Sequence, residues 1–157
     1  MKQTPRMQKI QENMRPGVIT LTGFLGTDTR NLADILIDDE AAVRRAGRTH
    51  ADIAARMMEL RDMGTVGLGE FVFVDPHFDI RVESVRGRLP CPFGDPGIFP
   101  KTNITVRNTA RKREITFTDL HIHMIQAHGF YEGRGSLFRL DPLDLIDILE
   151  VEAETGA

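Results

Sequence analysis

Three of the five histidines lie close together in the sequence, at His121, His123 and His128. Successive side chains of a β-strand point to opposite faces, so on a strand His121 and His123 share one face. Two imidazoles on one face can bind a single metal ion, either zinc or another divalent metal. In this interpretation His121 and His123 are metal ligands, and Cys91 or His77 is a further ligand.

The same segment also has the signals of an α-helix. Residues typical of helix caps stand at its two ends: Thr118 or Asp119 at the start and Gly129 after the last turn. On a helix His121 and His123 lie about 200° apart. His121 and His128 then share the apolar side, while His123 faces away from it. We favour the helix, for which no cofactor is expected.

Residues 119–123 resemble the Asp-x-His-x-His metal signature of amidohydrolase barrels. Such a barrel needs roughly 250 residues, whereas this chain has 157. The resemblance therefore assigns neither that fold nor that activity to this chain.

The segment from Pro90 to Pro100 contains four of the eight prolines and the single cysteine, Cys91. Proline fixes φ, so this loop keeps its shape at a low entropic cost and is a suitable platform for a reactive group. A cysteine acts as a nucleophile where a base or a cation stabilises its thiolate, and Arg86 and Arg88 are near in sequence. The alternative is that Cys91 is a small buried hydrophobic residue.

Together these two segments predict a cleft between residues 121–128 and the loop Pro90–Pro100. The candidate catalytic residues are His121, His128 and Cys91, because an imidazole titrates near neutral pH and suits acid–base chemistry. The candidate binding residues at the rim are Tyr131, Arg134 and Arg88.

The hydrophobic pattern before residue 65 is mainly helical. After a short strand expected at 18–22, apolar residues recur at helical spacing over 29–46 and 49–63. We expect N-caps for the first helix among residues 27–29, and a break near Asp38–Glu40. Thr49 and Asp52 resemble a capping box for the second helix.

The pattern then changes to the alternation that is typical of strands. Strands are expected at 71–74 and 78–83, and a hairpin over 101–118 should pair 104–106 with 115–117. Asp141-Pro142 begins a last helix. The order predicts an α+β fold, with N-terminal helices followed by a mainly antiparallel β-meander and a closing C-terminal helix.

The chain is expected to form one domain over residues 17–150. Residues 1–16 are expected to be an arm or a short helix, because Met7, Ile10 and Met14 lie on one helical face. Residues 151–157 are expected to be an acidic tail that frays.

Composition excludes several classes of function. The net charge of −3 argues against a nucleic-acid coat, although residues 39–62 faintly resemble a helix-turn-helix. A single cysteine cannot form an intrachain disulfide. We see no apolar run long enough to span a membrane and no secretory signal, so a cytoplasmic location is expected.

Two hypotheses for function remain. The favoured one is a self-associating or protein-binding domain, expected to be a homodimer, since the basic hairpin tip at 107–113 complements the acidic segment 141–154. Those charges could meet within one chain or across the dimer. The alternative is a small metal-dependent or Cys/His enzyme that uses the cleft described above.

Overall fold

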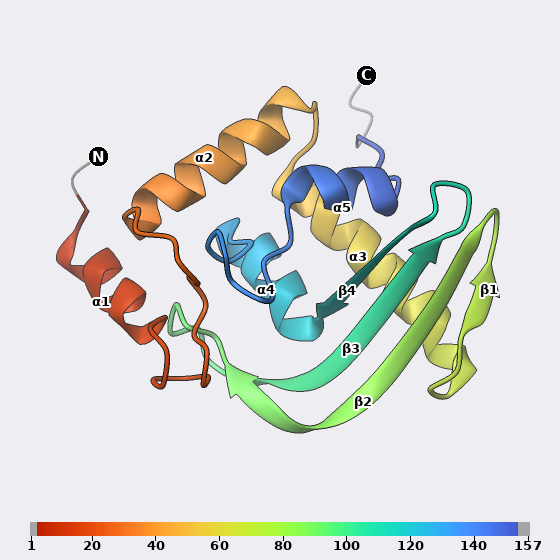
Figure 1. The fold of residues 1–157 in the computed structure, drawn as a ribbon, viewed down its shortest axis with the longest axis horizontal. Helices are drawn as coiled ribbons and strands as arrows, with labels where there is room; N and C mark the ends of the chain where they lie inside the picture. The colour runs from red at the N-terminus through yellow and green to blue at the C-terminus, as the bar shows by residue number, and fades with distance from the viewer. Residues whose placement is uncertain (1–2, 154–157) are drawn as a thin grey trace.

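The computed structural model describes residues 3–153 of the chain (Figure 1). Among these residues, helices lie at both ends of the sequence and the strands lie between them, which confirms the α+β class. The helices are α1 (Pro5–Asn13), α2 (Leu32–Arg45), α3 (His50–Gly64), the 3-10 helix η1 (Thr65–Gly67), α4 (Asp119–His128) and α5 (Pro142–Ile148). The strands are β1 (Val72–Val74), β2 (Phe78–Pro90), β3 (Ile98–Asn108) and β4 (Arg113–Thr118).

The strands form one antiparallel meander in the order β1-β2-β3-β4. In the predicted hairpin, Ile104 pairs with Phe117 and Val106 with Ile115, as expected. The register is set by burial, because a slip of one residue would turn these apolar side chains to the opposite face.

The ribbon of β2 and β3 is longer than the sequence suggested and curves under the helices in Figure 1. Its pairing continues to Pro90 and Ile98, so the expected loop Pro90–Pro100 is shortened to residues 91–97. The register shifts between Val85 and Arg88, which is a β-bulge of the kind that bends a strand.

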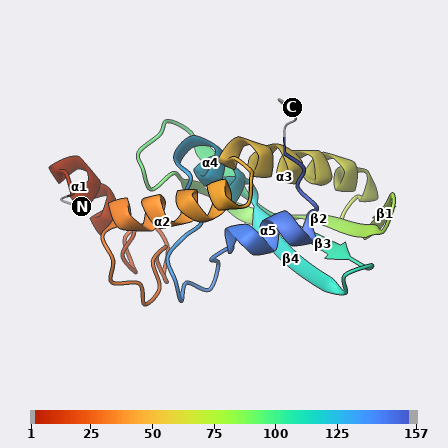
Figure 2. The same ribbon diagram turned by 90° about the horizontal axis from the view of Figure 1, so that it is seen from above.

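The main hydrophobic core lies between this sheet and the helices α3, α4 and α5. A second cluster beside it joins α1, α2 and the 91–99 segment to α4. Figures 1 and 2 show α1 and α2 farther from the main strands than α4 and α5 are. The opposite face of the sheet is polar, as the alternation predicted, with ion pairs such as Arg107 to Glu114 at 2.8 Å.

Three local expectations before residue 46 are wrong. Residues 18–22 form turns rather than a strand, because Gly23 lies against the backbone of residues 14–16 and folds this segment back onto the end of α1. The helix α2 continues through Asp38–Glu40 without a break. Its N-cap is Asn31 rather than a residue of 27–29, and the side chain of Gln11 accepts the N–H of Leu32.

The complementary charges at 107–113 and 141–154 meet within the chain. Arg111 and Arg113 both bind Asp147, at 2.7 and 2.8 Å, and Arg113 also binds Asp144 at 2.8 Å. These partly exposed pairs tie the hairpin tip to α5 and add modestly to stability. These charges are paired within one chain and so give no reason to expect a dimer. The homodimer stays a prediction, which light scattering can test.

The expected N-terminal arm contains a docked helix, since Ile10 and Met14 are buried. At the other end Val151 is buried too, and residues 154–157 of the expected acidic tail lie outside the described residues. None of the described helices has the length and apolar character needed to cross a membrane.

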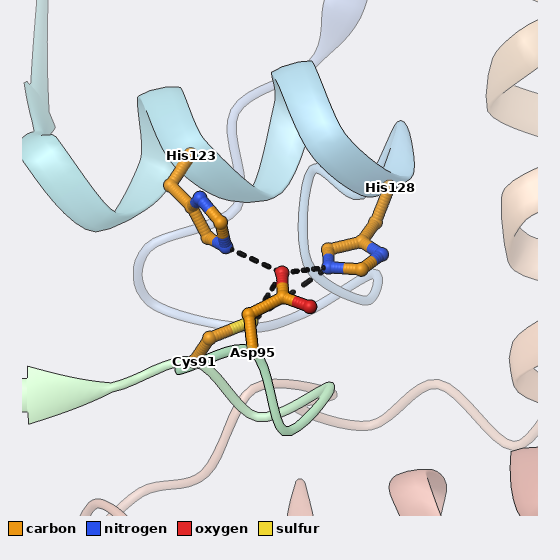
Figure 3. Close-up of side chains that lie close together, drawn as sticks. All are labelled: Cys91, Asp95, His123 and His128. Carbon is orange, nitrogen blue, oxygen red and sulfur yellow. Dashed lines mark hydrogen bonds and ion pairs between the residues drawn. The ribbon is translucent and has the colours of Figure 1, made fainter. Parts of the chain in front are cut away.

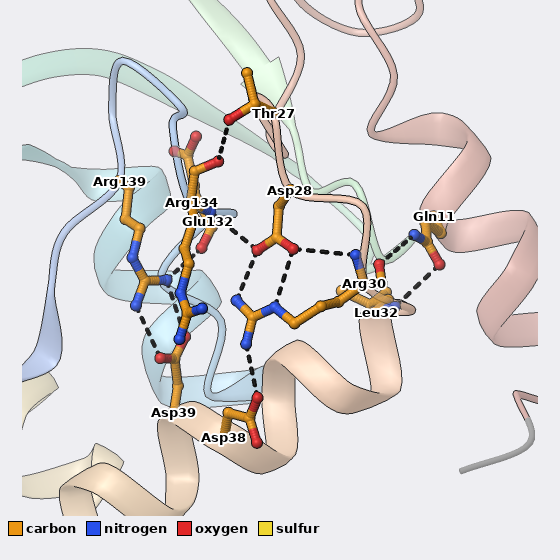
Figure 4. A network of polar contacts seen from close by, with 10 residues as sticks. All are labelled: Gln11, Thr27, Asp28, Arg30, Leu32, Asp38, Asp39, Glu132, Arg134 and Arg139. Atoms are coloured by element: carbon orange, nitrogen blue, oxygen red, sulfur yellow. Dashed lines mark hydrogen bonds and ion pairs between the residues drawn. The ribbon is translucent and has the colours of Figure 1, made fainter.

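A polar network holds the segment after α1 against the loop before α5 (Figure 4). Asp28, whose side chain is 3% exposed, binds the guanidinium of Arg30 at 2.6 Å and accepts the backbone N–H of Arg134 at 3.0 Å. Nearby, Arg139 makes a bidentate ion pair with Asp39, at 2.9 and 3.0 Å. Asp28 therefore belongs to a polar network and does not serve as the N-cap that the sequence suggested at residues 27–29.

Asp28 should make the stability depend on acid pH. The hydrogen bond from Arg30 holds the pKa of Asp28 well below its ordinary value. This stabilisation is present above the ordinary Asp pKa of about 4 and is lost as the pH falls toward the lowered pKa. We expect Asp28→Asn to cost about 1–3 kcal/mol at pH 7. Urea unfolding should show this difference shrinking toward pH 2, and a constant difference would contradict the assignment.

Candidate metal centre

Two histidines of α4 face the loop 91–97. The helix begins at the Thr118 cap and ends at Gly129, whose φ of 64° is the left-handed conformation that glycine adopts readily. His123 and His128 differ by about 140° around this helix. Both rings nevertheless turn toward the loop, which lies against this side of α4 (Figure 3). The structure confirms the helix that we favoured. It differs from our expectation at His123, which faces the loop rather than solvent.

The loop places a thiol and a carboxylate opposite these rings. Cys91 directly follows β2, and the backbone then turns so that the N–H of Gly94 bonds the carbonyl of Cys91 at 3.0 Å. Gly94 has a φ of 89°, which strongly favours glycine at this position. The turn brings the carboxylate of Asp95 next to the sulfur of Cys91, at 3.7 Å.

Four donor atoms from these two segments converge on one point. The Nε2 atoms of His123 and His128 both bond Oδ2 of Asp95, at 2.7 and 2.6 Å. The sulfur of Cys91 lies 3.8 Å from Nε2 of His128. All four donor atoms lie within 4.8 Å of one another, so this group could hold a metal ion.

These distances are close to those of a tetrahedral zinc site. Bond lengths of about 2.3 Å to sulfur and about 2.1 Å to nitrogen and oxygen separate sulfur from nitrogen by about 3.6 Å, and nitrogen from oxygen by about 3.4 Å. The 3.8 Å between Cys91 and His128 therefore already fits. The two hydrogen bonds to Asp95 are shorter, so this carboxylate would move outward by less than about 1 Å to admit the ion.

Aromatic rings fix the direction of both imidazoles. Phe93 stacks on His128, with ring centroids 3.9 Å apart and planes 7° from parallel. Phe99 stacks on His123 at 4.5 Å. Because each ring is held by packing, the two nitrogens keep their positions without an ion, and little entropy is lost when they bind one.

The charges around Cys91 distinguish a metal ligand from a free nucleophile. Burial raises the pKa of the Cys91 thiol, and the adjacent carboxylate of Asp95 also raises it. A nucleophile needs the opposite setting, with a cation that lowers the pKa. The backbone N–H groups of Phe93 and Asp95 act in the opposite direction and lower the pKa of the thiol. Such donors stabilise the thiolate once a cation replaces its proton.

Asp95 is prepared as an anionic partner. The hydrogen bond from His128, together with that from His123, lowers the pKa of Asp95 in spite of the opposing effect of desolvation. At neutral pH this carboxylate is therefore ionised and ready to bind a cation.

His121 lies apart from this group. It is 4% exposed, its Nε2 bonds Glu132 at 2.9 Å, and its Nδ1 accepts the backbone N–H of Thr118 at 3.1 Å. Both ring nitrogens are therefore occupied, and the residue caps its own helix in a capping box with Thr118. The structure brings Cys91 and His128 together but leaves His121 out.

The three predicted binding residues are also dispersed. Tyr131 is fully buried and bonds Nδ1 of His50 at 2.7 Å, and its burial raises the pKa of its hydroxyl. Arg134 is exposed beside the Asp28 network. Arg88 is exposed on β2 next to the bulge. His77, considered as a further ligand, bonds Glu150 at 2.5 Å instead.

Asp95 was missed at the sequence level. It stands in Gly94-Asp95-Pro96, where aspartate is common for conformational reasons alone. A signal was present in its spacing from Cys91, because a Cys-x-x-x-Asp turn can direct two ligands to one side.

Comparison with protein-family models, curated protein sequences and solved structures gives no match for this chain. The geometry of the four residues therefore has to support any functional assignment by itself.

Proposed function

We propose that this protein is a zinc-binding domain, in which one Zn²⁺ is held by Cys91, Asp95, His123 and His128. The observation that supports the proposal is the convergence of their four donor atoms within 4.8 Å, from a tight turn and one side of a helix. Cysteine, histidine and aspartate are all established ligands of this ion.

The donor set favours zinc over the hard divalent ions Mg²⁺, Ca²⁺ and Mn²⁺. A thiolate is too soft a ligand for Mg²⁺, Ca²⁺ or Mn²⁺, which prefer oxygen. Two imidazoles, one thiolate and one carboxylate suit Zn²⁺, because tetrahedral zinc sites use nitrogen, sulfur and oxygen ligands.

The role that we propose for the ion is structural. Four protein donors fill a tetrahedral shell, whereas catalytic zinc sites keep one position for water or substrate. Loop 91–97 has no regular secondary structure. A Zn²⁺ shared with α4 would fix this loop and the adjoining ends of β2 and β3 to the helix.

A second candidate is a metal-dependent enzyme. A surface cavity of about 540 Å³ lies beside the centre and is lined by Phe99 and Pro100 on one side and by Ile122, His123 and Gln126 on the other. This is close to the cleft expected from the sequence. For catalysis, a weakly held ligand such as Asp95 would have to leave the ion and open a position toward this cavity.

Substitution with Co²⁺ tests the donor set and separates the two roles. The Co²⁺ protein should show the near-ultraviolet charge-transfer band of a thiolate ligand and the intense visible bands of four-coordination. Added azide should leave both unchanged, because no position is open. A spectrum that azide changes would favour the enzyme.

The matched variants are Cys91→Ser and His77→Ala. Cys91→Ser should lose the charge-transfer band and weaken metal binding by more than about tenfold, since losing a ligand should cost at least as much as losing a residue that orients one. His77→Ala should behave as the unmodified protein. Thiolate bands that persist in Cys91→Ser, or weak six-coordinate bands in the unmodified protein, would contradict the proposed donor set.

A further inference from the structure

A second cavity, independent of the candidate metal centre, opens where the curved end of β2 and β3 meets the segment after α1. Its volume is about 420 Å³ and its walls are mainly apolar. Buried side chains line it from within, namely Phe24, Leu120 and Met124. This size is within the range of small-molecule sites, which are commonly apolar with a few polar groups.

The mouth of this cavity is unusually apolar. Leu21 is 88% exposed and Leu137 is 78% exposed, and Phe138 and Val85 also line the cavity and are exposed. These four side chains come from three separate parts of the chain. Exposed apolar side chains gathered around one cavity indicate a binding site, where an apolar ligand or partner would cover them.

One wall carries two polar groups without partners. Lys101 and Asn103 line the cavity from alternate positions of β3, which place both side chains on one face of the strand. Among residues 3–153, neither side chain has a hydrogen bond or an ion pair in the structure. Lys101 is exposed, and the end of its side chain, including the ammonium, lies beside Gly87 in the bulge, where a side chain would crowd it.

The other charged groups on the wall are already satisfied. Glu132 accepts from His121 at 2.9 Å and from the hydroxyl of Ser136 at 2.8 Å. Lys101 is therefore the only charged side chain without a hydrogen-bond or ion-pair partner among the described residues that line the cavity. The cavity combines an apolar interior with one cation and one amide donor.

We propose that this cavity binds a small aliphatic carboxylate. The chain would lie in the apolar cavity against Leu120 and Met124 of α4, and its carboxylate would accept from the ammonium of Lys101 and the amide of Asn103. A carboxylate has two oxygens for these two donors. A neutral or cationic amphiphile of the same length has no such match.

The test is a calorimetric titration with octanoate, decanoate and laurate below their micellar concentrations. Decanol and decyltrimethylammonium serve as neutral and cationic probes of equal chain length. Decanoate should bind at one molecule per chain, and more tightly than either of these. Methyl NMR signals of Leu120 and Met124 should shift on binding, whereas those of α5 should not.

Variants locate the charge contact. Lys101→Met keeps the aliphatic stem and should weaken decanoate binding by about tenfold or more, with little effect on decanol. The matched control Lys112→Met removes a lysine at the hairpin turn and should change nothing. Leu137→Ser, at the exposed mouth, should weaken decanoate and decanol alike.

Several outcomes would overturn the proposal. These are equal binding of decanoate and decyltrimethylammonium, decanoate binding that Lys101→Met leaves unchanged, and no binding below the micellar concentration. Light scattering during the titration checks one alternative, since a dimer that dissociates in Leu137→Ser would identify the mouth as a contact between two copies of the chain. Decanoate should bind equally well to the chelated and to the metal-loaded protein, because none of the four candidate metal ligands lines this cavity. A negative result with decanoate would therefore leave the zinc proposal unaffected.

Discussion

Treatment with EDTA is expected to lower the melting temperature of the protein by about 8–16 °C. A site held at about a thousand times its dissociation constant stabilises the folded state by about 4 kcal/mol. For a chain of this length each kcal/mol shifts the melting temperature by about 2–4 °C. The ion would add a further link between α4 and a loop that otherwise contacts it through the hydrogen bonds of Asp95, ring stacking and the second hydrophobic cluster.

Two variants serve as controls for this melt. Cys91→Ala should already melt near the temperature of the chelated protein and should show little further change with EDTA. His77→Ala should keep the full response to the chelator, because His77 lies outside the group. A melting temperature that EDTA leaves unchanged in the protein loaded with Zn²⁺ would contradict a stabilising role for the ion.

The second large effect is expected at His121, whose role is structural. Its removal leaves the carboxylate of Glu132, itself 3% exposed, without its imidazole partner. Breaking a buried charge-assisted pair in this way typically costs about 3–5 kcal/mol. We expect His121→Ala to destabilise by this amount in urea unfolding, measured with EDTA present so that metal binding does not contribute.

The comparison with His123→Ala makes this prediction specific. In EDTA that variant loses a partly exposed contact to Asp95 and a stacking contact with Phe99, so its cost should stay near 1 kcal/mol. With Zn²⁺ present its cost should rise, because a ligand is then lost, while the cost of His121→Ala should not change. Equal costs of the two variants in EDTA would contradict the separate roles assigned to them.

Sequence patterns predicted the elements whose signals are local. The capping box of Thr49 and Asp52 and the helix between Thr118 and Gly129 depend on residues a few positions apart, and both are present in the structure. Residues 18–22 have the composition of a strand, but none of the described strands pairs with them. Whether such a segment pairs is decided by tertiary packing, which composition does not encode.

The candidate site could be predicted only in part, for a similar reason. A helical wheel gives the direction of a side chain but not what lies in that direction. It placed His123 away from the apolar side correctly, yet the loop that carries Asp95 occupies that side. His121 is on the apolar side, as expected, but caps its own helix there. Cys91 and His128 lie near each other, as the expected meeting of the proline-rich loop and the histidines implied, while the catalytic role suggested for them stays a prediction.

The central claim is that four residues of this chain bind one Zn²⁺, and native mass spectrometry with elemental analysis tests it most directly. The protein would be loaded with equimolar Zn²⁺ and then freed of excess metal. The unmodified chain and His77→Ala should each retain one zinc per chain, whereas Cys91→Ala and His128→Ala should retain none. A metal-free unmodified chain, or full zinc retention by both ligand variants, would contradict the account.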